Sequence, residues 1–215
     1  MKQNLEKNQT HRKKEGRLGE EKRTRLTQKA IVEVAAELFA RNGFGATSLD
    51  DIAEILGVTK PALYYHIKNK EEILRLICLL ILNVAEEPLL HIVESDLPPV
   101  EKLRRAIEHH IAIAADRSPA LSVFYREQQH LTGPFAKEIA LRKKDYEHYF
   151  QRILEEGQAT GAFKAIDSKI VTFGLLGMCH WLSQWYKPYG RYTPQQIAEI
   201  FANMIESGLI PSPPC

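Results

Sequence analysis

The chain has 215 residues, of which 44% are hydrophobic and 26% charged, with a formal net charge of +2. This size and apolar content allow a proper core in one or two domains. No run of eighteen apolar residues is present and the N-terminus is basic and polar, so we expect neither a membrane span nor a secretory signal. The three cysteines are odd in number and far apart, which favours reduced thiols and a cytoplasmic protein over a disulfide framework.

The first 25 residues carry most of the charge asymmetry. They hold nine Lys or Arg and four Glu, a net of +5, so the rest of the chain nets to −3. We predict a disordered basic arm over residues 1–20, because this segment lacks periodic apolar residues. Such an arm either contacts DNA phosphates or the minor groove, or is a solvated tail, and the sequence leaves both interpretations open.

Apolar residues at helical spacing predict an all-α fold of nine helices, and no segment alternates for long enough to be a strand. The expected helices cover residues of about 24–42, 48–56, 59–66, 69–93, 99–116, 118–130, 134–160, 168–186 and 193–208. Pro88 falls inside the fourth of these helices and should bend it.

The stretch TSLDDIAEILGVTKPALYYHIKNK, residues 47–70, carries the clearest functional signal. Thr47 or Ser48 can cap a helix, and an aspartate three residues on completes the spacing of a capping box. Apolar residues then recur on one helical face. Gly57 ends this helix where the backbone needs a positive φ.

A second short helix follows the turn, with Thr59 as a possible cap and Pro61 in its first turn. Two short helices joined by a turn with glycine form a helix-turn-helix, which places its second helix in the DNA major groove. Its polar and aromatic side chains can donate to phosphates and base edges. We therefore predict double-stranded DNA as a partner, contacted by Thr47, Ser48, Thr59, Lys60, Pro61, Ala62, Tyr64, Tyr65, His66 and Lys70. The alternative is a helical hairpin inside an all-α core.

Residues 35–74, AAELFARNGFGATSLDDIAEILGVTKPALYYHIKNKEEIL, resemble the DNA-binding domain of TetR-family transcriptional regulators, and the resemblance covers about residues 24–75. Pro61 and Ile67 depart from the family pattern, which more often has a small residue and Phe there. The resemblance implies a DNA-binding domain over residues 21–70 and a ligand-binding and dimerisation domain over residues 71–215. It also implies a transcriptional regulator, most often a repressor.

The two C-terminal helices are candidates for a homodimer interface. A three-helix DNA-binding domain contacts one half-site, so two copies are needed to bind both half-sites of a pseudo-palindromic operator. Small residues allow close approach on one helix and an apolar stripe marks the other, at Gly174, Gly177, Met178, Ile197, Ile200, Phe201, Met204 and Ile205. The TetR resemblance implies an antiparallel four-helix bundle there. The alternative is that both helices pack only within one subunit.

Residues 180–209 resemble the TetR branch that controls fatty-acid or steroid-ring degradation and responds to acyl-CoA thioesters. Trp181 and Trp185 belong to its aromatic group, whereas Gln184 departs from it and puts a phosphate contact in doubt. The resemblance implies a long-chain acyl-CoA as effector. An apolar tunnel with cations at its mouth would suit such a ligand. The predicted ligand-binding residues are Phe124, Arg126, Phe150, Trp181, Gln184 and Trp185, with ordinary core packing as the alternative for the aromatics.

The sequence gives little support for a metal site or an enzyme active site. His109 and His110 are adjacent, so on a helix they point in different directions, and no metal-ligand spacing is present. There is no G-x-S-x-G and no glycine-rich phosphate loop, so we predict no metal, no cofactor and no enzyme. A regulator that responds to multidrug-like compounds or other small molecules remains the alternative, and a metal sensor is a weaker one.

Overall fold

The computed structural model describes residues 26–211, and these residues are all-helical, as predicted. They form nine α-helices and one short 3-10 turn. In chain order these are α2 (Gln28–Asn42), α3 (Leu49–Leu56), α4 (Lys60–Tyr64), α5 (Lys70–Glu94), α6 (Pro99–Ala114), α7 (Pro119–Glu127), η1 (Gln128–His130), α8 (Gly133–Ala159), α9 (Ser168–Trp185) and α10 (Pro194–Leu209). The basic arm expected over residues 1–20 lies outside the described residues.

The ends of α3 and α4 follow the local sequence signals. Ser48 caps α3, and Asp51 completes the capping box with Ser48. Gly57 ends α3 at a φ of 65°, in the left-handed region that favours glycine. Thr59 precedes α4 without a side-chain capping bond, so the proline in the first turn is the main local signal that starts this helix.

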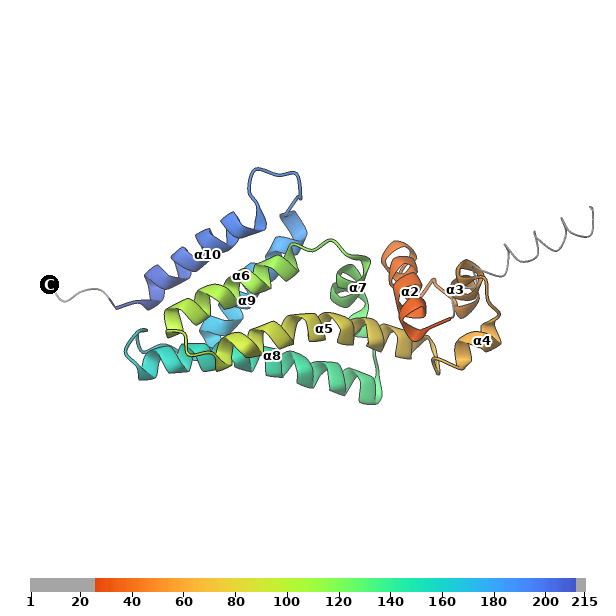
Figure 1. Ribbon diagram of the computed structural model, residues 1–215, viewed down its shortest axis with the longest axis horizontal. Helices are drawn as coiled ribbons and strands as arrows, with labels where there is room; N and C mark the ends of the chain where they lie inside the picture. Colours follow the sequence, from red (N-terminus) through yellow and green to blue (C-terminus); the bar gives the residue numbers. More distant parts are fainter. Residues whose placement is uncertain (1–25, 212–215) are drawn as a thin grey trace, which may run out of the picture.

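The helix-turn-helix lies at one end of an elongated molecule (Figure 1). Helices α2, α3 and α4 gather at this end, and α10 lies towards the other. Helix α5 leads from the helix-turn-helix along the length of the molecule and packs beside α8, α7 and α6 (Figure 1). It continues through Pro88 as a single helix. Because α5 belongs to both ends, it connects the DNA-binding unit to the larger domain.

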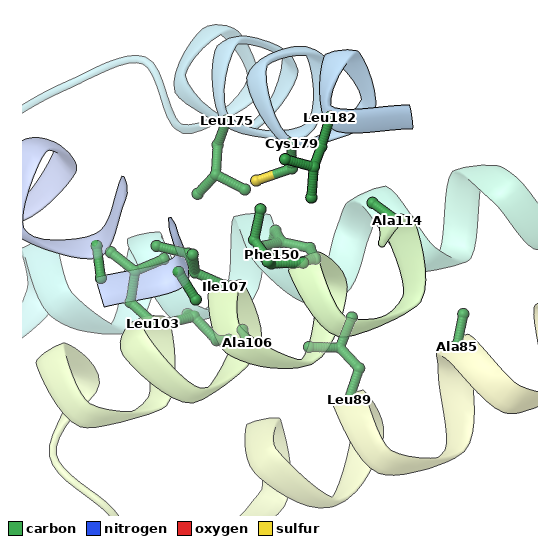
Figure 2. Close-up of a cluster of buried hydrophobic side chains, with 14 of the residues drawn as sticks. Ala85, Leu89, Leu103, Ala106, Ile107, Ala114, Phe150, Leu175, Cys179 and Leu182 are labelled. Carbon is green, nitrogen blue, oxygen red and sulfur yellow. The ribbon is translucent and has the colours of Figure 1, made fainter. Parts of the chain in front are cut away.

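Two hydrophobic clusters hold the helices together. The larger one joins the second half of α5 to α6, α8, α9 and α10. Figure 2 shows Phe150 of α8 between residues of α6, such as Ile107, and residues of α9, such as Cys179 and Leu182. Burying these side chains contributes about 1.5–3 kcal/mol each. This packing fixes α6, α8 and α9 as a frame around the cavity described below.

The second cluster does not stop at residue 70. It joins α2, α3 and α4 to Ile73 and Ile77 of α5, and to Val123 and Phe124 of α7. The helix-turn-helix therefore shares its core with two helices of the larger domain. A domain boundary between residues 70 and 71 stays a prediction.

Helix α5 is long and apolar enough to cross a membrane by length and composition. Core helices of soluble proteins pass the same test. Here its side chains Ile73, Leu74, Leu89 and others enter both hydrophobic clusters. The structure thus gives the hydrophobicity of α5 a packing role.

Candidate functional site

Helix α4 presents two tyrosines to solvent. Leu63 and Ile67 are buried beneath it and anchor the helix, while Tyr64 is 51% and Tyr65 88% exposed. Each ring offers apolar surface together with a hydroxyl that can donate or accept. Both side chains are accessible to DNA, and their contact with it stays a prediction.

Lys60, also on α4, forms an ion pair with Asp50 of α3, with Nζ 2.8 Å from Oδ2. The hydrogen bond to Asp50 raises the pKa of Lys60. Because the pair lies on the surface, it is weak and can open for a phosphate. Of the other predicted contacts, Ser48, Thr59 and Pro61 are exposed and Ala62 and His66 are half-buried.

Two residues predicted to contact DNA, Thr47 and Lys70, form hydrogen bonds within the chain. Thr47 is only 1% exposed, and its hydroxyl donates to the carbonyl of Gly43 at 2.9 Å. Lys70 Nζ donates to the carbonyls of Phe44 and Thr47 at 2.7 and 2.6 Å and lies over the Phe44 ring. In the single chain both side chains help to fix the loop between α2 and α3, and their contact with DNA stays a prediction.

A cavity of about 350 Å³ lies among α5, α6, α7, α8 and α9. Most of its wall is apolar, formed by Ile81, Leu82, Ala85, Ile113, Leu121, Phe124, Phe173 and Leu176. A few polar side chains interrupt this wall, among them His110, Tyr146, Lys143 and His180. An apolar wall with a few placed polar groups is typical of a small-molecule site.

A second, more polar cavity of about 230 Å³ adjoins the first, and Leu121 and Tyr125 line both. Its other lining residues include Asp116, Arg117, Ser118, Ser122, Arg126, Ser183 and Gln184. The guanidinium of Arg117 donates to the carbonyls of Ser183 and Tyr186 at the end of α9. The two neighbouring cavities can accept a ligand with one apolar and one polar end.

The structure separates the six ligand residues predicted from the sequence. Phe124 lines the apolar cavity, and Arg126 and Gln184 line the polar one. Phe150 is fully buried in the larger core and lines neither cavity. Trp181 and Trp185 are 64% and 45% exposed on the outer side of α9, so neither forms a tunnel wall in the single chain.

Most residues of the apolar cavity were missed by the sequence analysis, and a hydrogen-bonded pair of polar residues is the most informative omission. His110 of α6 and Tyr146 of α8 face each other, with His110 Nδ1 2.8 Å from the Tyr146 hydroxyl. A signal for His110 did exist, because it lies on the same helical face as Leu103, Ile107 and Ala114, where a polar residue is unusual. The position of Tyr146 beside it depends on a helix 36 residues away and had no local signal.

Helix α7 connects the cavity to the helix-turn-helix. Leu121 and Phe124 on α7 line the cavity. At the end of the same helix, buried Glu127 accepts a hydrogen bond from Phe44 N–H at 3.3 Å. The His130 ring stacks on Phe44 with centroids 5.4 Å apart. A ligand that moves α7 therefore acts on the loop that orients α3 and α4.

A helix-turn-helix joined to a helical domain with its own cavity defines a DNA-binding transcriptional regulator. Two family models match the chain, "Bacterial regulatory proteins, tetR family" over residues 31–77 and "Tetracyclin repressor-like, C-terminal domain" over residues 96–209. The chain belongs to the TetR family of transcriptional regulators. The family assignment is thus confirmed, as is the prediction that the protein is not an enzyme.

Relatives with similar architecture include transcriptional regulators and a repressor. The transcriptional repressor KstR2 of Mycobacterium tuberculosis is 28% identical over 188 residues, covering 83% of this chain and 90% of its own. AibR, solved with isovaleryl coenzyme A and operator DNA, is 34% identical with a TM-score of 0.74, and the match covers 82% of this chain and 96% of AibR. PfmR of Thermus thermophilus is 29% identical with a TM-score of 0.77, and the match covers 87% of this chain and 99% of PfmR.

Proposed function

We propose that the protein is a homodimeric repressor that binds a pseudo-palindromic operator in the cytoplasm and is released by an acyl-CoA. The exposed side of α4 and its neighbours supports the DNA-binding part. One such surface contacts one half-site, and two copies are needed for half-sites about one helical turn apart. We propose repression, not activation, because the chain is similar to the transcriptional repressor KstR2.

The outer sides of α9 and α10 support a dimer. Ile170, Phe173 and Trp181 are exposed along α9, and Ile200 and Met204 along α10. At Gly174 and Gly177 of α9 an added Cβ would meet nothing within 4 Å, so a second helix can approach closely. Exposed apolar surface of this kind marks an interaction site in a soluble protein.

The paired cavities support an acyl-CoA as effector. The acyl group would occupy the apolar cavity, and polar parts of the CoA would lie towards Arg117, Arg126 and Gln184. AibR, a relative of the same architecture, was solved with isovaleryl coenzyme A. Arg142, a further cation near the cavity, is held by Glu86 at 2.8–2.9 Å and is less available for a phosphate.

The cavity volume favours a shorter acyl group than the long chain expected from the sequence. Ligand pockets in proteins span about 300–1,000 Å³. A cavity of about 350 Å³ lies at the small end of this range. We propose acyl groups of short to medium length, or a compact ring, for this site.

The observation that carries the proposal is the position of α7, which forms a wall of the cavity and holds the Phe44 loop through Glu127. A ligand shifts DNA affinity only if it prefers one of two conformations. The second conformation would differ in how α7 and α5 place the two helix-turn-helix units relative to each other. Binding energy in the cavity can reach the DNA surface by this path.

The test is a titration of acyl-CoAs of increasing length into the complex of the protein with the DNA upstream of its own gene, followed by fluorescence anisotropy. We expect release by short to medium acyl-CoAs and none by free CoA. Ala85→Phe, which fills the cavity from α5, should bind the DNA normally but resist release. Failure of every acyl-CoA, with release by a multidrug-like cation, would favour the alternative effector class.

A metal sensor is less well supported. Within residues 26–211, no group of three or more His, Cys, Asp or Glu side chains is arranged to hold a metal ion.

A further inference from the structure

A hydrogen-bonded pair lies in the wall of the mostly apolar cavity. His110 and Tyr146 both line it, and they are joined by the contact of 2.8 Å between Nδ1 and the hydroxyl. The His110 ring also packs edge-on against Phe150, which limits its movement. The pair is therefore held in place by the core.

The protons of this pair can be assigned by counting partners. Burial lowers the pKa of His110 to about 4, with His109 and His180 as smaller causes, so the imidazole is neutral and carries one N–H. Burial also raises the pKa of Tyr146, so its hydroxyl keeps its proton. If Nδ1 carried the imidazole proton, both Nε2 and the Tyr146 O–H would lack a partner. If Tyr146 donates to Nδ1, only Nε2–H is left unpaired, and this arrangement costs less.

His110 Nε2 is covered by protein atoms and has no hydrogen-bond partner among the described residues. Buried polar atoms without partners are rare, and each calls for an explanation. The same ring forms part of the cavity wall, so a molecule bound in the cavity lies next to it. The unpaired atom is a donor, and it calls for a ligand that brings an acceptor.

We propose that His110 Nε2–H donates a hydrogen bond to a carbonyl oxygen of the ligand, so that the cavity selects molecules with a carbonyl among their apolar atoms. This inference rests on the proposed role of the cavity as effector site. The carbonyl can come from the thioester that every acyl-CoA carries or from a ketone within the acyl group. A hydrocarbon without oxygen leaves the donor unpaired, and so does a cation that carries no acceptor atom.

The experiment compares hexanoyl-CoA with its thioether S-hexyl-CoA, and hexanoyl-CoA with 5-oxohexanoyl-CoA, by calorimetric titration of the full-length protein. In the wild type we expect the carbonyl-bearing member of at least one pair to bind about tenfold more tightly. A preference in the first pair assigns the thioester, and one in the second pair assigns a ketone.

Variants connect this preference to the proposed residues. His110→Phe combined with Tyr146→Phe keeps the aromatic volume and leaves no orphaned hydroxyl, so it should bind both members of each pair equally. His180→Phe removes another imidazole from the same cavity and should keep the preference. Equal binding within both pairs by the wild type would overturn the inference, as would a preference that persists in the double variant.

A probe without CoA separates this inference from the acyl-CoA assignment. Cyclohexanone and methylenecyclohexane share a shape and differ in a carbonyl oxygen. In ¹⁵N NMR of the wild type, only cyclohexanone should shift the Nε2 resonance of His110. If cyclohexanone shifts this resonance while no CoA derivative binds, the carbonyl site is supported and the acyl-CoA assignment is wrong. If both probes leave the resonance unchanged and no CoA pair discriminates, the carbonyl site is disproved.

Discussion

Lys70 shows how one side chain can fix a loop next to the helix-turn-helix. Its ammonium group binds the carbonyls of Phe44 and Thr47 between α2 and α3. We predict that Lys70→Met lowers the free energy of unfolding by about 1–3 kcal/mol, because two carbonyls lose a charged donor. Thermal unfolding measures this, with the exposed Lys68→Met as control. A variant of full stability that binds DNA weakly would instead support Lys70 as a DNA contact.

His110 should make stability depend on pH. Its pKa is about 4 in the folded protein and 6.5 in the unfolded chain, so the unfolded chain binds the proton first as the pH falls. Neutral His110 makes its full contribution to the free energy of unfolding above pH 6.5. As the pH falls from 6.5 to 4, the free energy of unfolding decreases by at most about 3 kcal/mol. Urea unfolding at several pH values should show a steeper loss for the wild type than for His110→Phe with Tyr146→Phe. Parallel curves would contradict this.

Among the elements, α8 depends on a glycine near its end. Gly157 faces Phe163, and an added Cβ would lie 2.0 Å from its ring. Gly157→Ala must expel Phe163 or shift the helix, and we predict a loss of stability on the order of 2–4 kcal/mol. Gly208→Ala in α10 meets nothing within 4 Å and should raise stability by up to about 1 kcal/mol. Thermal unfolding of both variants tests these two predictions.

Helix α4 is five residues long and depends on Leu63 and the neighbouring Ile67 for its position. Lys60 and Tyr64 point away from these anchors. We predict that Lys60→Ala and Tyr64→Ala each weaken operator binding by about 1–3 kcal/mol, with the Lys60 effect falling as salt rises. Anisotropy titrations with operator DNA measure this, and unchanged affinity of the double variant would remove α4 from the interface.

For the whole molecule, the dimer is the property to test. Ile200 and Met204 are exposed in the single chain, so charging them should not disturb the core. We predict that Ile200→Glu with Met204→Glu yields a folded monomer, because burying two charges in an apolar interface is costly. Sedimentation equilibrium reports the mass, with Leu141→Glu on α8 as a control that remains dimeric. A dimeric double variant would place the interface elsewhere.

The helices and the helix-turn-helix motif can be predicted from local sequence patterns. The capping box at Ser48 and the positive φ at Gly57 depend on neighbours a few residues away, so local chemistry predicts them. The apolar spacing of each helix is likewise a local pattern. For this reason the all-α fold, the helix-turn-helix and the TetR resemblance follow from the order of the residues alone.

Which side chains contact one another depends on how the helices pack and cannot be predicted from local patterns. Lys70 lies 26 residues from Phe44, and Glu127 lies 83 residues from it, so no local pattern reveals either contact. The same holds for Phe150 in the core, for Trp181 on the surface and for the pairing of His110 with a tyrosine. Aromatic residues are equally suited to a core, a cavity or an interface, and only the packing of the helices assigns each one its place.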